Sequence, residues 1–149
     1  MHLWSVQLSE SLSWKTHVKY KFREKGHINL QEARCRRTVI KRAPFHSKIC
    51  IMQDSRVCLG ASLKGRSPSQ SLNRVLVTEL PYVVGMDLHI GGIYNPTWSI
   101  RADDVSRDHP IRDPTAPVPA WFWALRARGP AACLTELDAL SMQSRGLAR

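Results

Sequence analysis

The stretch KICIMQD, residues 48–54, decides the fold, because it is a short apolar run that ends in one acidic residue. Such a run is typical of a strand that is buried on both faces of a sheet. A second run of this type, LHIGGIY, occupies residues 88–94. Between the two runs, apolar residues recur at helical spacing over residues 72–80, and Pro81 ends or kinks that helix. A strand, a helix and a further strand in this order predict an α/β sheet.

The residues before this stretch predict two antiparallel strands and a helix. Polar and apolar side chains alternate over residues 3–8 and again over residues 12–22, which is the period of a half-buried strand. The segment SESLS between them favours a hairpin turn. Asn29 then predicts a helix N-cap, with Glu32 at the spacing of a capping box. This helix is expected to run to about Arg42, because a proline follows soon after.

The residues after the second apolar run predict a short helix and a tail. ADDVSR, residues 102–107, favours the short helix. Four prolines in the next segment predict a stiff linker over residues 110–120. Residues 121–149 are expected to form a short helical or disordered tail, with a helix at 131–142. Within the predicted domain at 1–109 the order is strand, strand, helix, strand, helix, strand and short helix, which indicates a mixed α/β sheet.

The composition is basic and modestly apolar. Of 149 residues, 43% are hydrophobic, and 22 Lys and Arg exceed 12 Asp and Glu for a net charge of +10. The hydrophobic fraction supports a folded core. The positive charge favours a polyanionic partner such as nucleic acid, or an anionic membrane surface, and does not choose between them. The first ten residues lack the pattern of a signal peptide, and no apolar run reaches the roughly 20 residues of a membrane span. We therefore expect an intracellular protein of the cytoplasm or nucleus, without membrane contact.

Three acids lie where an α/β sheet places a functional site. Glu32 falls in the first turn of the predicted helix, Asp54 ends the predicted strand, and Asp103 begins the last helix. Acids at strand ends and helix starts converge at one edge of such a sheet. Clustered carboxylates favour Mg²⁺, and two such ions activate a water and stabilise the leaving oxygen of a phosphodiester. The alternative is structural, since Glu32 would then close a capping box while Asp54 and Asp103 cap the following helices.

The chain also resembles a known family over about residues 14–107. The strings HINLQEARCRR, MQDSRVCLGASLKGRSPSQSLNRVL and YNPTWSIRADDVSRD resemble the later portion of the ribonuclease H (RNase H) region of retrotransposon reverse transcriptases, particularly of DIRS-like elements. The resemblance implies a partial RNase H-like mixed sheet. It places the second catalytic acid of the family on Glu32, the third on Asp54 and the fourth on Asp103.

The function that the resemblance implies is Mg²⁺-dependent hydrolysis of the RNA strand in an RNA–DNA hybrid, with the same three acids as metal ligands. A site of this kind reads backbone shape and the 2′-hydroxyl rather than base edges. The basic residues expected to hold phosphates are Lys64, Arg66, Arg74 and Arg107. The alternative for these residues is an ordinary solvated surface, with Arg107 in an ion pair of little energetic weight.

The chain departs from the family pattern at the first catalytic acid. The family carries this acid on its first strand in a D-A-S-like segment, whereas no Asp precedes Asp54 here. The two predicted N-terminal strands then correspond to the second and third strands of the fold, so that the first strand and one metal ligand are missing. Ile100 replaces a usual Asn, and Arg36 and Arg37 occupy positions that are normally more apolar.

Three hypotheses of function follow from the sequence. The first is a truncated RNase H-like fragment that binds nucleic acid, lacks nuclease activity and binds Mg²⁺ weakly at best. The second is an active nuclease whose site is completed by another acid or another chain. The third is a translated genomic remnant that has no stable fold and no selected function.

Overall fold

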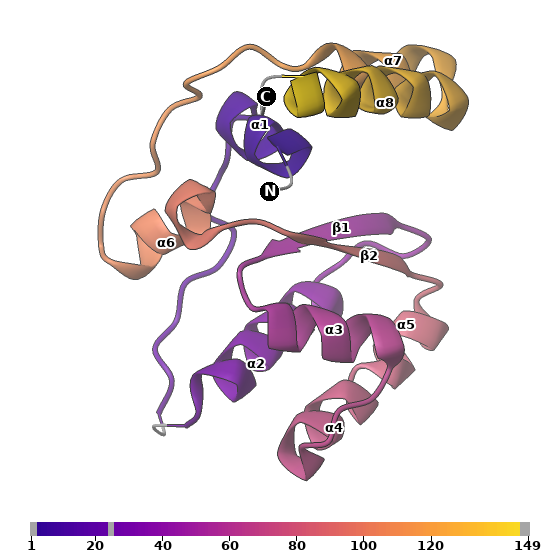
Figure 1. Cartoon of the computed structure of the whole chain (residues 1–149). Helices are drawn as coiled ribbons and strands as arrows, with labels where there is room; N and C mark the ends of the chain where they lie inside the picture. Colours follow the sequence, from indigo (N-terminus) through magenta and orange to yellow (C-terminus); the bar gives the residue numbers. More distant parts are fainter. Residues whose placement is uncertain (1–2, 24–25, 147–149) are drawn as a thin grey trace. The chain divides into compact units, whose positions relative to one another are not determined.

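The computed structural model describes residues 3–23 and 26–146, and these fall into two compact units (Figure 1). The central unit is Val18–Ile100. The terminal unit combines the described residues of Met1–His17 and of Arg101–Arg149. The candidate site described below is built from the central unit alone.

The central unit is a small α/β structure. Its strands β1 (Lys48–Gln53) and β2 (His89–Tyr94) pair in parallel, with Lys48 opposite His89 and Gln53 opposite Tyr94. The helices of the unit are α2 (Ile28–Lys41), α3 (Arg56–Lys64), α4 (Gln70–Val77) and α5 (Leu80–Gly85), and a 3₁₀ turn covers Thr97–Ser99. The positions of both predicted strands are therefore confirmed, and the combination of helices with this sheet is compatible with the predicted α/β class. The prediction that the strands are buried on both faces is wrong, because their residues are exposed or half-buried. The predicted mixed sheet is not seen either, since the described sheet has two parallel strands only.

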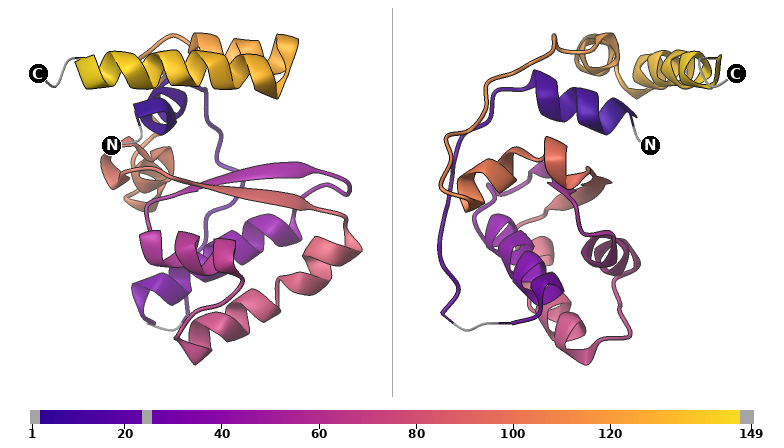
Figure 2. Two further views of the ribbon diagram at one scale, coloured as in Figure 1. Left: turned by 45° about the vertical axis from the view of Figure 1, so that its right-hand side comes forward. Right: turned by 60° about the vertical axis from the view of Figure 1, so that its left-hand side comes forward.

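The core of the central unit is formed by buried side chains of α2, α3 and α4. Figure 2 gives two further views of these helices. Small buried side chains on α2 and α3 allow the helices to approach closely. Ala33 on α2 is 1% exposed, and it packs with Cys58 and Ala61 of α3. The apolar side of α4 closes this core with Leu72, Val75 and Leu76. The helical spacing seen in the sequence thus forms one buried face of α4.

Local side chains fix where α2 and α3 begin. The predicted N-cap at Asn29 is wrong, because His27 caps α2 and its Nδ1 accepts a hydrogen bond of 3.3 Å from the backbone N–H of Asn29. The apolar pattern does not predict helix α3, although the alternative role of Asp54 as a cap implies a helix there. Ser55 caps it by accepting a hydrogen bond of 3.2 Å from the N–H of Cys58. Ser55 fills this role, so Asp54 is not the cap of α3 and its carboxylate is free for other contacts.

Pro81 separates two helices rather than kinking one. Helix α4 ends at Val77, and α5 begins at Leu80 with the proline in its first turn. A proline in the first turn costs no hydrogen bond, because that backbone N–H would have no partner within the helix. The end of α2 at Lys41, ahead of Pro44, agrees with the sequence prediction.

The predicted N-terminal hairpin is wrong. Leu3–Ser11 form helix α1, and the described residues from 12 to 23 form neither a helix nor a strand. Alternation over residues 3–8 covers too few positions to separate the period of a strand from that of a helix. Alternation over residues 12–22 is longer, but a strand also needs a hydrogen-bonded neighbour, and the described sheet contains β1 and β2 only.

The terminal unit is helical in its described parts. Besides α1 it contains α6 (Arg101–Ser106), α7 (Ala120–Arg128) and α8 (Pro130–Gly146). The short helix predicted at 102–107 is confirmed as α6, and the helix predicted at 131–142 lies within α8. Trp121 of α7 is buried and meets Trp4 of α1 edge-on, with ring centroids 6.1 Å apart. Within the described residues, no helix has both the length and the apolar composition that crossing a membrane requires.

Candidate nucleic-acid interface

The predicted acids divide between the two units. Glu32 and Asp54 belong to the central unit, whereas Asp103 lies on α6 of the terminal unit, where Arg107 holds its carboxylate at 3.1 Å. The neighbouring Asp104 is bound by Arg112 at 2.9 Å, and this hydrogen bond lowers the pKa of Asp104. The structure thus gives the two acids of α6 partners within their own unit.

Glu32 and Asp54 lie where α2 and α3 begin. The Ser55 hydroxyl is 3.4 Å from the side-chain oxygen of Asn29, and the Cys58 thiol donates to the backbone carbonyl of Asn29 at 3.0 Å. These contacts join the first turns of α2 and α3. Burial raises the pKa of the Cys58 thiol, and the nearby carboxylate of Glu32 also raises it. Glu32 therefore faces the start of α3, directly after the strand end that carries Asp54.

The carboxyl ends of both strands contribute to the same edge of the sheet. Asp54 follows β1 and accepts a hydrogen bond of 2.8 Å from the Thr97 hydroxyl, which comes shortly after β2. Asn95 follows β2, is fully buried, and donates its backbone N–H to the carbonyl of Gln53 at 3.0 Å. Sequence analysis missed Asn95 and Thr97, although an Asn directly after a predicted parallel strand is a usable signal.

The side chains at this edge of the sheet include some, but not all, of the oxygen ligands that a cation such as Mg²⁺ needs. One carboxylate oxygen of Glu32 is buried without a hydrogen-bond partner among the described residues. Glu32 and Asp54 supply the oxygen ligands that Mg²⁺ takes. Among residues 3–23 and 26–146, however, no three or more His, Cys, Asp or Glu side chains are grouped so as to hold a metal. The Mg²⁺ site with Asp103 as a third ligand stays a prediction.

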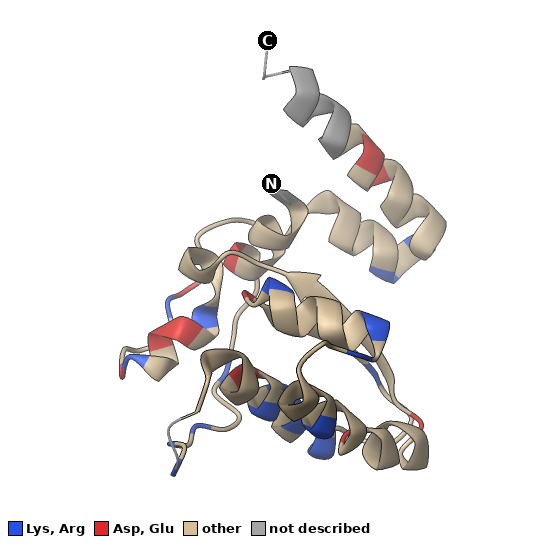
Figure 3. Cartoon of the chain, turned by 60° about the horizontal axis from the view of Figure 1, so that its bottom comes forward, with Lys and Arg blue, Asp and Glu red and all other residues tan. Residues whose placement is uncertain are grey.

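The central unit carries most of the positive charge. Residues 18–100 contain 14 of the 22 Lys and Arg but five of the 12 Asp and Glu, so nearly all of the net charge of +10 belongs to this unit. Figure 3 shows the basic positions along α2 and at both ends of α3. This distribution places the electrostatic attraction for a polyanion on the central unit.

Three of the four predicted phosphate-binding residues belong to the central unit. Lys64 ends α3, Arg66 lies in the loop after it, and Arg74 is on α4, all of them exposed. Asn73 fastens this loop to α4, because its side chain accepts from the Ser67 N–H at 2.6 Å and donates to the Ser67 carbonyl at 2.7 Å. The loop therefore presents its basic residues from a fixed backbone. Arg107, the fourth, lies in the terminal unit.

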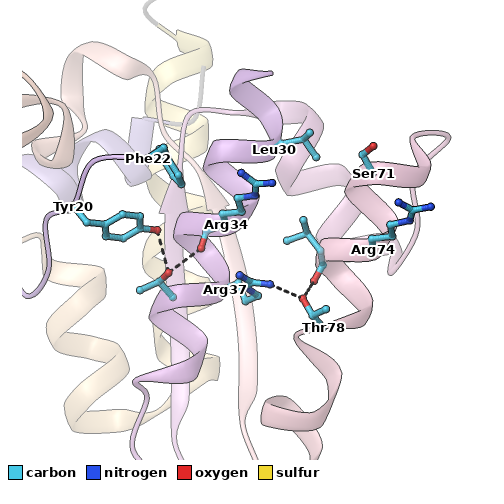
Figure 4. Close-up of a pocket in the computed structure, with 10 residues that line it drawn as sticks. Tyr20, Phe22, Leu30, Arg34, Arg37, Ser71, Arg74 and Thr78 are labelled. Carbon is cyan, nitrogen blue, oxygen red and sulfur yellow. Dashed lines mark hydrogen bonds between the residues drawn. The ribbon is translucent and has the colours of Figure 1, made fainter. Parts of the chain in front are cut away.

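A groove of about 620 Å³ runs between α2 and α4 (Figure 4). Helix α2 lines it with Arg34 and Arg37, and α4 lines it with Ser71 and Arg74. Its remaining lining residues are Tyr20, Phe22, Leu30, Thr38, Val75 and Thr78. The groove therefore has three arginines, and none of these described lining residues is acidic.

Arg36 and Arg37 are neighbours in the sequence, but their guanidinium groups have different hydrogen-bond partners. Arg36 is 11% exposed and forms a buried ion pair with Glu79, which is 4% exposed. Burial raises the pKa of Glu79, and the charge of Arg36 opposes this rise. Arg37 instead reaches across the groove and donates to the Thr78 hydroxyl at 3.1 Å, while its Nε has no acceptor among the described residues. Arg37 also lies near enough to Glu79 for its charge to lower the pKa of that carboxyl, but Glu79 does not line the groove.

Two aromatic rings complete the groove on the side of α2. Tyr20 and Phe22 meet edge-on, with ring centroids 5.2 Å apart and an interplanar angle of 74°. The Tyr20 hydroxyl lies 3.0 Å from the Thr38 hydroxyl, which fastens this irregular segment to α2 (Figure 4). Sequence analysis assigned both rings to a strand and therefore missed their place beside Arg34 and Arg37.

Comparison with protein-family models, with curated proteins and with solved structures finds no match to this chain. The functional interpretation therefore depends on the geometry of the central unit and on the resemblance of its sequence motifs.

Proposed function

We propose that this protein binds nucleic acid through the basic groove of its central unit and does not cleave it. The observation that carries the proposal is the convergence of Arg34, Arg37 and Arg74, from two different helices, on one groove whose described lining has no acidic side chain. Guanidinium groups suit phosphate because their planar forks donate two parallel hydrogen bonds. Lys64 at the end of α3 and Arg66 in the loop before α4 are two further exposed basic residues of the central unit, outside the lining of the groove.

We also propose that the chain derives from the RNase H-like domain of a retroelement reverse transcriptase. Parallel β1 and β2 support this origin, as does the position of Asp54 directly after β1 and beside Thr97. The missing first acid of the family pattern argues against cleavage, because a two-metal site needs several carboxylates to hold its cations. An RNA–DNA hybrid is accordingly the first polyanion to test.

Binding is tested by fluorescence anisotropy of a dye-labelled RNA–DNA hybrid titrated with the full chain. Arg74→Ala and Lys64→Ala are each expected to weaken binding several-fold, because each removes one contact to phosphate. Lys48→Ala is the matched control, since it removes the same charge from β1, away from the groove. Equal losses for all three variants, or no binding by the unmodified chain, would overturn the proposal.

Nuclease activity is the second candidate function, and the unpartnered carboxylate oxygen of Glu32 favours it. It is tested by incubating the labelled hybrid with the protein and Mg²⁺ and separating the products by size. We expect no cleavage above the buffer control. Cleavage that disappears in the Asp54→Asn variant would establish the nuclease and refute this part of our proposal.

A further inference from the structure

We infer that the groove between α2 and α4 takes an unpaired segment of nucleic acid, with a base on the rings of Tyr20 and Phe22. This inference rests on the proposed function and specifies its ligand. A bound RNA–DNA hybrid would then be held at a single-stranded end or overhang rather than along its duplex.

The aromatic side of the groove selects for unpaired bases. In a duplex, the faces of the bases are covered by their neighbours in the stack, so that a protein ring has nothing to stack on. In a single strand every base presents its face, and stacking on aromatic side chains contributes strongly to binding for any sequence. Tyr20 is 42% exposed and is fastened to α2 by its contact with Thr38, so its ring is both accessible and positioned.

The basic sides of the groove are spaced to hold the backbone beside such a base. Arg34 and Arg37 are three residues apart on α2 and therefore share one face of the helix. Ser71 and Arg74 have the same spacing on α4 and line the other wall of the groove (Figure 4). The volume of about 620 Å³ lies in the range of sites that enclose small organic groups.

The inference is tested with the full chain and two dye-labelled probes, a 12-nucleotide single strand and a blunt duplex of the same sequence. We expect tighter binding of the single strand. Phe22→Leu is expected to weaken its binding roughly tenfold, because an aliphatic side chain cannot stack on a base. The same variant should leave binding of the duplex unchanged.

Two further variants separate stacking from damage to the fold. Phe45→Leu removes an aromatic ring that is 65% exposed in the same unit and outside the groove, and it should leave both affinities unchanged. Tyr20→Phe keeps the ring and loses the hydroxyl, and it should retain most of the affinity for the single strand. Circular dichroism and thermal melting of each variant report whether it is folded. A single strand that carries 2-aminopurine provides a second readout, because its fluorescence falls when the base stacks.

The outcomes distinguish this inference from the proposed function. No preference for the single strand, or an equal loss of both probes in Phe22→Leu, would overturn the stacking site while leaving nucleic-acid binding intact. If Phe22→Leu is unfolded, the test is the fluorescence of the 2-aminopurine strand with the unmodified chain. Unchanged fluorescence when this strand binds would overturn the inference. If the protein binds neither the single strand nor the duplex, both this inference and the proposed function are overturned.

Discussion

Arg36 and Arg37 are adjacent in the sequence, yet their side chains have different roles. Arg36 is buried against Glu79 and serves the packing of α2 on the segment before α5, whereas Arg37 faces the groove. Sequence analysis treated both as departures from an apolar stretch, because their partners lie more than forty residues away along the chain. Long-range pairing of this type leaves no local pattern to recognise.

The Arg36–Glu79 pair is expected to matter for stability. Glu79→Ala leaves the guanidinium of Arg36 buried without its carboxylate, which should lower the free energy of unfolding by about 3–5 kcal/mol. Urea denaturation monitored by circular dichroism measures this change. Asp87→Asn is the control, because the Asp87–His46 pair is exposed on both sides, and it should leave the denaturation midpoint unchanged. Similar midpoints for the two variants would contradict the importance of the buried pair.

The same glutamate predicts a dependence of stability on pH. Burial raises the pKa of Glu79 in the folded state despite the opposing charge of Arg36. The folded state therefore binds the proton more tightly than the unfolded state, and this contribution is complete below the unfolded-state pKa of about 4.3. It is lost as pH rises through the higher folded-state pKa. We therefore expect the unmodified chain to lose stability relative to Glu79→Gln as the pH rises from the unfolded-state pKa through the folded-state pKa. Urea denaturation of both proteins at a series of pH values measures this difference. Two parallel profiles of stability against pH would show that Glu79 does not contribute.

At the scale of elements, continuous apolar runs were informative and short alternation was not. The two apolar runs predicted the positions of β1 and β2 correctly, but not their burial, because every residue of both strands is exposed or half-buried. Helix α3 was missed, although Ser55 immediately precedes it, since its residues show no strong apolar spacing. The alternation at residues 12–22 predicted a strand, but no neighbouring strand pairs with it in the described sheet.

Helix α3 packs closely on β2 and leaves little space for a side chain at Gly92. A Cβ added at Gly92 would lie 2.5 Å from Leu59 Cδ1, whereas one added at Gly91 would meet nothing closer than a backbone oxygen at 3.9 Å. Because Leu59 is half-buried and can turn its side-chain end aside, Gly92→Ala should lower the free energy of unfolding by only about 0.5–1.5 kcal/mol, the cost of an unfavourable rotamer, and Gly91→Ala should be close to neutral. Chemical denaturation of the two variants measures this difference.

A double variant identifies the cause. If the Cβ clashes with Leu59, the cost of Gly92→Ala should be smaller in a Leu59→Ala background than in the unmodified chain. Equal costs in both backgrounds, or equal stability of Gly91→Ala and Gly92→Ala, would show that the packing of α3 on β2 is looser than described.

At the scale of the whole molecule, the sequence allowed the α/β class and the position of Asp54 at the end of β1 to be predicted. The basic residues Lys64, Arg66 and Arg74 are exposed in the central unit, and their contact with phosphate stays a prediction. The groove itself could not be predicted, because Tyr20 and Phe22 belong to a segment without regular secondary structure whose path depends on tertiary contacts. The grouping of α6 with α1, α7 and α8 in the terminal unit likewise leaves no signal in local sequence.

Weak binding of Mg²⁺ is expected for the whole chain. Glu32 and Asp54 provide two carboxylates, and the chain has no counterpart of the first acid in the family that its motifs resemble, so that the charge available to hold a hard cation is low. Isothermal titration calorimetry of the unmodified chain with MgCl₂ should give no saturating heat at micromolar protein concentrations. Tight uptake with a defined stoichiometry that is lost in Asp54→Asn would show a complete metal site.

Salt dependence of nucleic-acid binding tests the basic groove most directly. The affinity of the full chain for the single-stranded probe is measured by anisotropy over a range of KCl concentrations, for the unmodified protein and for Arg34→Ala, Arg37→Ala, Arg74→Ala and Lys48→Ala. Log affinity should fall linearly with log salt, and each groove variant should reduce the steepness of that line by about 0.7, since each removes one phosphate contact, while Lys48→Ala leaves it unchanged. A line whose slope is the same for all five proteins would contradict binding through the groove.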